Sequence, residues 1–210
     1  MLDNVAVAIF LLVCLGFHGL INLHNILLVH GPRNVTRFRS KAEAPSKIAV
    51  ILGGLGTLFY FLEIGTYSLV ALINPFSSDS FFFPLQFPFM LFLQGLGLVF
   101  TSAGFFIFNW SVTIRGRYAV SWNMPENHRL ITTGPYRYVR HPSYLGFFFM
   151  FIGLPLLLSN PFSLIPLIAI PGYYRATAHE ERLLTERFGN EYQEYQKKTG
   201  RFFPKLHRTR

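Results

Sequence analysis

The chain has few charged residues and a single cysteine, and each scarcity excludes a class of protein. Charged side chains make up 14% of its 210 residues, whereas soluble domains carry about 25%, which leaves no room for a large soluble domain. Cys14 is the only cysteine, so an intrachain disulfide and a cysteine-based metal site are both excluded. Hydrophobic residues instead reach 51%, with 24 phenylalanines, as is typical of a polytopic membrane protein.

Five apolar runs are candidates for membrane-crossing helices, because a spanning helix needs about 20 mainly apolar residues. They cover residues 5–29, 48–73, 87–108, 145–158 and 162–174. The last two are short, and the turn former Ser159-Asn160-Pro161 separates them, so we expect a tight helical hairpin. The predicted fold is therefore all-α and polytopic, with about five transmembrane helices in a single domain over residues 1–210.

The loops between these runs differ in their positive charge. The first and third loops and the C-terminal tail are basic, whereas the second and fourth loops carry neither Lys nor Arg. By the positive-inside rule, the N-terminus lies outside and the C-terminus lies in the cytoplasm. The net charge of +9 is accounted for by these loops. No basic stripe on a soluble fold indicates a nucleic-acid partner.

A polar, turn-rich segment from Gly134 to Gly146 lies against the first arm of the hairpin. Arg140 and His141 precede Pro142, so we expect extended backbone there, with N–H and C=O groups available to a ligand. The alternative is a basic loop at the membrane interface, anchored by tyrosines. The loop charges put this segment on the cytoplasmic side, where a soluble nucleotide-like cofactor is available.

The tail begins with two adjacent carboxylates, Glu180 and Glu181, just beyond the last apolar run. We expect an amphipathic helix from His179 to about Lys198, because apolar side chains recur at steps of three and four residues. The alternative role for the two carboxylates is favourable charge near a helix N-terminus. Zinc is not expected, because Leu183 stands where a zinc-protease helix has its second histidine.

Two features inside the apolar runs are ambiguous. Glu63 is an intramembrane carboxylate, which is functional by default, although it can also lie near the outer interface. The Gly95-Leu96-Gly97 step is explained by close helix packing at least as well as by a cofactor contact.

Together, the polar segments resemble the isoprenylcysteine carboxyl methyltransferase family of integral membrane enzymes. The wider group to which that family belongs also includes phospholipid N-methyltransferases. The matching pieces follow one another with suitable spacing: His128–Tyr136, Arg140–Gly146, Ser159–Pro161, Glu180–Glu181, Phe188–Tyr195 and Phe203–Pro204.

The resemblance implies a methyltransferase that uses S-adenosyl-L-methionine as its cofactor, bound from the cytoplasmic side. It implies a cofactor-binding and catalytic region at residues 111–210, after three N-terminal spans within residues 1–110. It also implies a set of cofactor-binding residues: His128, Arg129, Leu130, Ile131, Tyr136, His141, Pro142, Ser143, Tyr144 and Glu180.

Three residues are candidates for catalysis: Arg140, Arg175 and Glu181. A carboxylate acceptor is already ionised at pH 7 and needs an arginine to orient it, for which Arg140 and Arg175 are the candidates. In eukaryotic family members an arginine shortly before the glutamates meets the substrate, and its equivalent here is Arg175 or, in a shifted alignment, Ala176. An amine or thiol acceptor must lose a proton, and His141 or Glu181 is then the base.

The implied reaction is methyl transfer to a lipophilic or lipid-tailed acceptor at the cytoplasmic face of the membrane. It is most like carboxyl O-methylation of an isoprenylcysteine, while phospholipid N-methylation and thiol S-methylation stay open. Membrane lipids are the other expected contacts. The enzyme is expected in the cell membrane of a prokaryote or the endoplasmic reticulum of a eukaryote. Alternatives of other classes are an NADPH-dependent reductase similar to sterol reductases and a non-enzymatic membrane scaffold.

Overall fold

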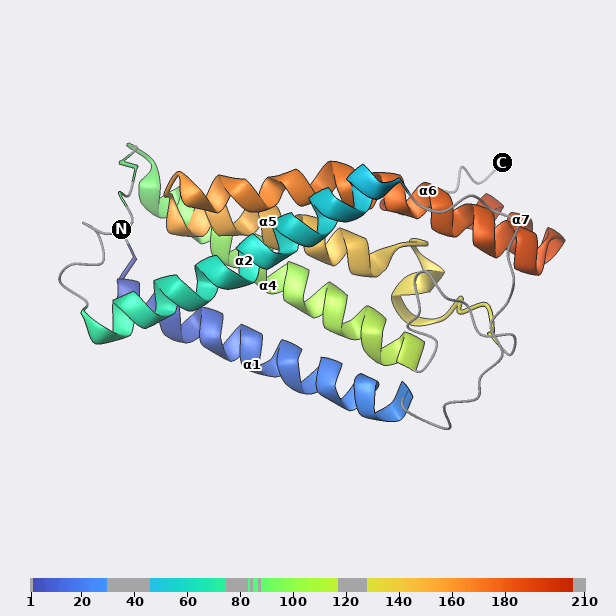
Figure 1. The fold of residues 1–210 in the computed structure, drawn as a ribbon, viewed down its shortest axis with the longest axis horizontal. Helices are drawn as coiled ribbons and strands as arrows, with labels where there is room; N and C mark the ends of the chain where they lie inside the picture. Colours follow the sequence, from blue (N-terminus) through green and yellow to red (C-terminus); the bar gives the residue numbers. More distant parts are fainter. Residues whose placement is uncertain are drawn as a thin grey trace.

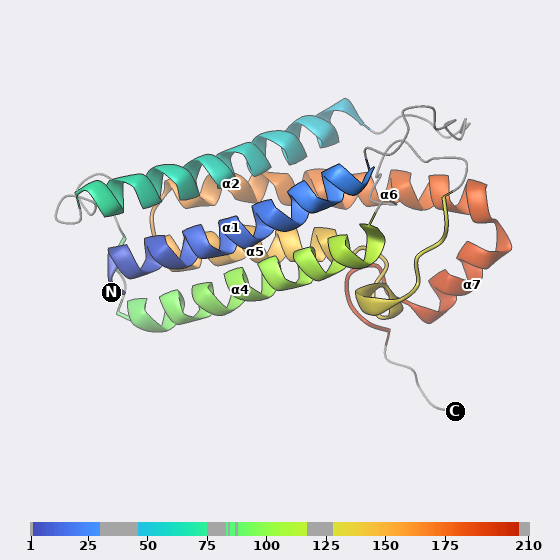
Figure 2. The ribbon, with the colours of Figure 1, turned by 90° about the horizontal axis from the view of Figure 1, so that it is seen from below.

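The computed structural model describes residues 2–29, 46–74, 83, 85–86, 88–116 and 128–205. Within these ranges the chain is helical, apart from loops and one isolated pair of extended residues, Val139 and Gly200. The long helices run side by side along the longest axis of the molecule (Figures 1 and 2). They are α1 (Asn4–Val29), α2 (Lys47–Ile73), α4 (Met90–Arg115), α5 (Pro142–Leu158) and α6 (Ala169–Phe188). The shorter helices are η2 (Gly134–Arg137), η3 (Phe162–Ile168) and α7 (Asn190–Lys198).

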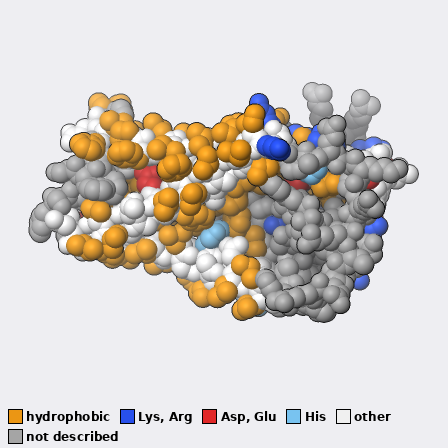
Figure 3. Space-filling model, in the orientation of Figure 1, with side chains coloured by type: hydrophobic (Ala, Val, Ile, Leu, Met, Phe, Trp, Pro, Cys, Tyr) orange, Lys and Arg blue, Asp and Glu red, His pale blue; other side chains and the backbone are white. Residues whose placement is uncertain are grey.

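Three of the described helices, α1, α2 and α4, are long and apolar enough to cross a membrane. Their flanks expose many large apolar side chains, and Figure 3 shows hydrophobic side chains over most of the visible side of the bundle. The prediction of an all-helical, multi-pass chain is confirmed. Helix α5 has 17 residues and is about 26 Å long, shorter than a hydrocarbon core of about 30 Å. The total of five spans therefore stays a prediction. The side of the membrane on which the first two loops lie also stays a prediction, because these loops fall almost wholly outside the described residues.

Helix α4 continues seven residues past its predicted end at Phe108 and stops at Arg115. The extra turns contain polar residues, which had suggested a loop. Ser111 Oγ donates a hydrogen bond to the Phe108 carbonyl at 2.8 Å, and Thr113 Oγ1 donates to the Asn109 carbonyl at 2.8 Å. These hydroxyls bond back to their own helix, so they do not end it. The extension carries Arg115 to the end of the bundle where the polar segments gather.

Helices α4 and α5 pack with their backbones almost in contact. A Cβ atom added to Gly97 would lie 2.4 Å from the backbone N of Leu157, and one added to Gly104 would lie 2.7 Å from the Gly146 carbonyl oxygen. Gly97 and Gly104 are seven residues apart, so they lie on one face of α4. This confirms close packing as the reason for Gly97, whereas a Cβ on Gly95 meets nothing within 4 Å.

A second close contact joins α2 to α6. A Cβ on Gly56 would lie 2.6 Å from the Ala169 Cβ, and one on Gly172 would lie 2.6 Å from the Ala49 carbonyl oxygen. The expected hairpin does turn at Ser159, but its arms do not form a tight pair. Instead, α5 packs mainly on α4 and α6 mainly on α2, because the glycines lie on those faces.

The tail does not begin a new helix at His179, as was expected. Helix α6 already includes that residue and continues from the second hairpin arm to Phe188. The break comes at Gly189, whose φ of +53° suits glycine, and α7 then turns back toward the bundle (Figure 2). The carboxylates Glu180 and Glu181 consequently lie in the middle of a helix rather than at its N-terminus.

The glycine contact between α4 and α5 can be tested by adding one methyl group. We expect Gly97→Ala to lower the free energy of unfolding by about 1–3 kcal/mol, because backbone atoms of α5 cannot move aside as a side chain can. Thermal unfolding in detergent would measure this. The matched control is Gly95→Ala, two residues away in open space, which should leave stability unchanged or raise it. Equal loss in both variants would contradict the packing argument.

Candidate functional site

The segment before α5 is held by the C-terminal end of the described chain. The Arg140 N–H donates a hydrogen bond to the Gly200 carbonyl at 2.8 Å, and the His141 N–H donates to the Arg201 carbonyl at 3.1 Å. The prediction that these N–H groups are free for a ligand is therefore wrong, because residues 200 and 201 run alongside and accept from them. The pairing holds the Arg140 and His141 side chains against the middle of α6, where Glu181 lies.

Glu181 is a buried carboxylate that meets three cationic side chains. Its oxygens accept hydrogen bonds from Arg140 Nε at 2.8 Å, from Arg201 Nη2 at 2.7 Å and from His141 Nε2 at 3.2 Å. These partners come from the loop before α5 and from the C-terminal segment. Glu181 therefore ties both segments to α6.

These contacts set the protonation of the cluster. Burial alone raises the pKa of Glu181, but hydrogen bonds from His141, Arg201 and Arg140 outweigh it and hold the pKa well below its usual range. Burial alone lowers the pKa of His141, but its contacts with Glu180 and Glu181 outweigh that effect and raise the pKa. The carboxylate of Glu181 is therefore ionised at neutral pH, and the charged form of the His141 imidazole is stabilised.

Glu180 points to the other side of the same helix turn. Its carboxylate accepts a hydrogen bond from the Tyr144 hydroxyl and lies 3.6 Å from His141 Nδ1. His141 thus stands between the two carboxylates. Glu181 is enclosed by cations, whereas Glu180 faces a pocket.

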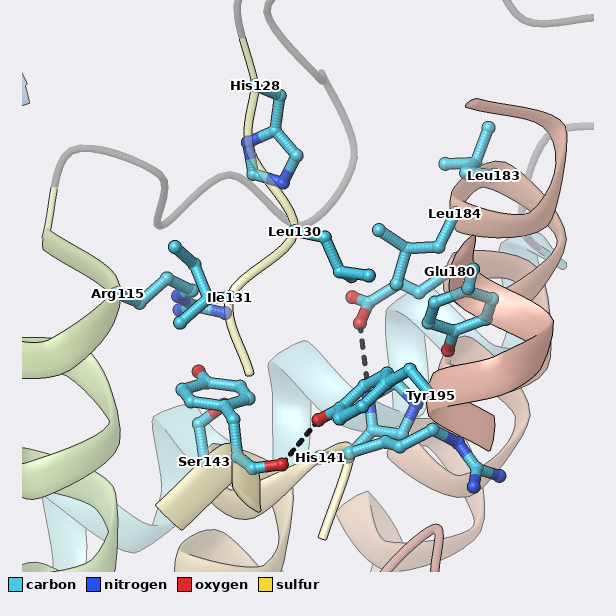
Figure 4. A pocket seen from close by; sticks show the side chains of 13 residues that line it. Arg115, His128, Leu130, Ile131, His141, Ser143, Glu180, Leu183, Leu184 and Tyr195 are labelled. Atoms are coloured by element: carbon cyan, nitrogen blue, oxygen red, sulfur yellow. Dashed lines mark hydrogen bonds and ion pairs between the residues drawn. The ribbon is translucent and has the colours of Figure 1, made fainter. Parts of the chain in front are cut away.

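The pocket lies at the end of the bundle, between the C-terminal end of α4 and the helices α6 and α7. Figure 4 shows Arg115 and Ile131 on one wall and Glu180 and Leu184 on the other. The pocket is lined by Arg115, His128, Leu130, Ile131, Tyr136, Arg140, His141, Ser143, Glu180, Leu183, Leu184, Tyr192 and Tyr195.

The structure brings most of the residues in the expected cofactor set to this pocket. Those that line it are His128, Leu130, Ile131, Tyr136, His141, Ser143 and Glu180. Pro142 and Tyr144 are buried behind the lining, and Tyr144 contacts Glu180. Arg129 is exposed and does not line the pocket. The expected catalytic residues separate: Arg140 lines the pocket, Glu181 lies behind it, and Arg175 is exposed on α6 outside it.

Sequence reasoning missed several residues of the site. Arg115 had been counted only as a charge of the third loop. Tyr192 and Tyr195 had been counted as part of an amphipathic face and of the matching range Phe188–Tyr195, without a role in the site. The three- and four-residue spacing of the tyrosines gave the correct helix face, but it did not indicate that this face closes a pocket. Arg201 carried no signal of its own, since its pairing with Glu181 exists only after the tail folds back. Glu63 is not part of the site, because it lies in the bundle beside Asn160.

The chemistry of the lining fits a polar cofactor. Glu180 offers a carboxylate to an ammonium group, and Arg115 offers a cation to an anion. The hydroxyls of Tyr136 and Tyr192 are buried, and among the described residues they have no hydrogen-bond partner. Buried hydroxyls are normally hydrogen-bonded. Leu130, Ile131 and Leu184 add apolar surface that suits an aromatic base or an alkyl chain.

Comparison with known proteins finds similarity in this region. Residues 96–186 match the isoprenylcysteine carboxyl methyltransferase family. The predicted resemblance is confirmed over that range, which begins inside α4, earlier than the motifs suggested. The range ends at residue 186, so the Tyr-rich α7 and the Phe203-Pro204 end lie beyond it. It includes Arg115, the polar segment, the hairpin and both glutamates.

Curated relatives carry names from the same family. A probable protein-S-isoprenylcysteine O-methyltransferase of Oryza sativa subsp. indica is 34% identical over 112 residues, which is 51% of this chain and 59% of the rice protein. The protein-S-isoprenylcysteine O-methyltransferase of Saccharomyces cerevisiae is 46% identical over 77 residues, which is 36% of this chain and 32% of the yeast protein. The chain thus spans little more than half the length of the rice protein and a third of the yeast protein.

Comparison with solved structures also gives a match. It is the structure of the eukaryotic intramembrane Ras methyltransferase ICMT, with a TM-score of 0.49 and 20% sequence identity. The match covers 90% of this chain and 74% of that chain.

The carboxylate of Glu181 should be essential to the fold around the site. We expect Glu181→Gln to lower the free energy of unfolding by about 3 kcal/mol, because Arg140 would keep its charge in a buried place without its partner. Thermal unfolding in detergent would measure the loss. The control is Glu194→Gln, which removes an exposed pair with Lys197 and should change nothing measurable. A stable Glu181→Gln variant would contradict the structural role.

Proposed function

We propose that the chain is an S-adenosyl-L-methionine-dependent methyltransferase of the membrane, and that the pocket beside Glu180 binds the methyl donor. One observation carries the proposal: the Arg140-His141 segment and Glu180, which are 40 residues apart in the sequence, form one polar pocket inside the region that matches the family model. S-adenosylmethionine, when bound, supplies an electrophilic methyl group on a sulfonium. The protein then needs to position the acceptor rather than activate the methyl group.

Glu180 is proposed to hold the ammonium group of the donor. Its carboxylate faces the pocket, and Tyr144 and His141 fix its orientation. Tyr136 and Tyr195 add aromatic faces to the lining, which tolerate a positive charge through cation–π attraction.

The protonation states favour an acceptor that is already ionised, such as a carboxylate. Glu181 is a poor general base because three cations hold its pKa low, and His141 is a poor one because its two ring nitrogens already face Glu180 and Glu181. An amine or thiol acceptor needs a base poised near the working pH. Carboxyl O-methylation, which the names of the relatives also carry, is therefore preferred over N- or S-methylation.

Arg140 is proposed as a positioning residue rather than as the arginine that binds the methyl acceptor directly. Its Nε binds Glu181 and its Nη1 donates to the Thr199 carbonyl, while the side chain still lines the pocket. Arg175 remains the candidate for meeting the acceptor from the outer side of α6, where Tyr174 is also exposed. The acceptor itself is proposed to be lipid-tailed, because apolar helix flanks lead up to the site.

The orientation is proposed from the loop charges: the N-terminus outside, and the pocket and C-terminus in the cytoplasm. A cytoplasmic pocket gives a water-soluble donor direct access. The host membrane follows from the cell type, either the cell membrane or the endoplasmic reticulum.

Donor binding is the first test of this function. S-adenosylhomocysteine should raise the unfolding temperature of the purified protein, as a ligand of the folded state must, whereas NADPH should not. Glu180→Gln should weaken binding by about tenfold to a hundredfold, since a hydrogen bond to a charged group contributes about 1.5–3 kcal/mol. The control is Glu191→Gln, at an exposed position of α7. A shift with NADPH but not with S-adenosylhomocysteine would favour the reductase alternative.

Transfer of a labelled methyl group tests the acceptor. The panel is a prenylated cysteine with a free carboxylate, the same compound as its methyl ester, a phosphatidylethanolamine and a small thiol. We expect label only on the free carboxylate of the prenylated cysteine. Label on the phospholipid or the thiol, with none on the carboxylate, would overturn the argument from the missing base.

A further inference from the structure

The hydroxyl of Tyr192 is a buried polar group that the fold does not satisfy. Tyr192 is 0% exposed and lines the pocket. Its hydroxyl has no hydrogen-bond partner among the residues that the structure describes. An unsatisfied buried hydroxyl costs about 1–3 kcal/mol, so a phenylalanine would be the more stable residue if packing were the only role.

The other tyrosine of α7 that lines the pocket, Tyr195, has a hydroxyl with a structural role. Tyr195 is also buried, and its hydroxyl donates to the Tyr136 carbonyl at 2.6 Å. It ties α7 to the loop before α5. The two tyrosines lie three residues apart on one helix and line the same pocket. Of their two hydroxyls, only that of Tyr195 has a hydrogen-bond partner among the described residues.

The surroundings of Tyr192 indicate which part of a ligand it meets. Its electrostatic neighbours include Glu180, Glu181 and Arg140. Burial, followed by the charge of Glu181, raises its pKa, so the hydroxyl keeps its proton at neutral pH and acts as a donor. As a donor, it suits an acceptor atom of the ligand close to the group that Glu180 holds.

We propose that Tyr192 binds the methyl donor by donating its hydroxyl hydrogen bond to the donor's α-carboxylate. This assignment rests on the proposed function, in which Glu180 holds the α-ammonium. The ammonium and the carboxylate share one carbon, so a donor beside Glu180 is well placed for the second group. Glu180 then binds the α-ammonium and Tyr192 binds the α-carboxylate of the same amino-acid moiety.

The test is Tyr192→Phe, which removes one oxygen and keeps the ring. Binding is measured for S-adenosylhomocysteine and for its decarboxylated analogue, which retains the amine. The variant should bind S-adenosylhomocysteine about tenfold to a hundredfold more weakly and should bind the decarboxylated analogue as the wild type does. Equal weakening for both ligands would place the hydroxyl on the nucleoside and overturn the carboxylate assignment.

Unfolding of the ligand-free protein gives a second, independent readout. Tyr192→Phe should raise the unfolding temperature, or leave it unchanged, because it removes an unsatisfied buried hydroxyl. The matched control, Tyr195→Phe, should lower it, because that variant loses the bond to the Tyr136 carbonyl. A Tyr192→Phe variant that is less stable but binds S-adenosylhomocysteine normally would show a structural role and overturn the proposal.

The same measurements separate this proposal from the function on which it rests. If the wild type binds S-adenosylhomocysteine and Tyr192→Phe binds it equally well, only the role of Tyr192 falls. If the wild type does not bind S-adenosylhomocysteine, the proposed function and this assignment fall together.

Discussion

The buried ion-pair cluster around Glu181 is the interaction on which the site depends. It joins α6 to Arg140 and His141 before α5 and to Arg201 near the end of the described chain. These segments are far apart in the sequence and carry like charges, so without the carboxylate they would repel one another. Burying a carboxylate is costly unless cations and hydrogen bonds surround it. The cluster meets that condition, and it therefore holds the segments in one arrangement.

The chemistry of the pocket follows from the same cluster. Charge pairing that stabilises the fold disfavours Glu181 and His141 as general bases, because it lowers the pKa of the first and places both ring nitrogens of the second against carboxylates. With neither of these residues as a base, the proposed acceptor is one that is ionised beforehand. The adjacent residue, Glu180, is not enclosed by cations in the same way and faces the pocket. Neighbouring carboxylates thus take different roles because successive residues of a helix point in different directions.

Most of the fold was predictable because it depends on local composition. Apolar runs of sufficient length predicted α1, α2 and α4, and the turn former at Ser159 predicted the reversal between α5 and α6. The predictions failed where backbone contacts between distant segments decide the outcome. The hairpin arms separate because each finds a glycine-lined partner on another helix. The end of α4 was misplaced because Ser111 and Thr113 satisfy their hydroxyls within the helix.

The sequence by itself determined the class of the protein, the three long apolar helices and the motif residues that resemble a known family. Those properties are carried by residue type and short spacing, which a single chain displays directly. Only the tertiary structure decided that Glu181 is enclosed by cations, that Arg115 and Tyr192 line the pocket, and that Arg175 does not. The physical reason is that burial, pKa and hydrogen-bond satisfaction depend on which distant side chains meet. That meeting is set by how glycine faces and charged groups pack in three dimensions.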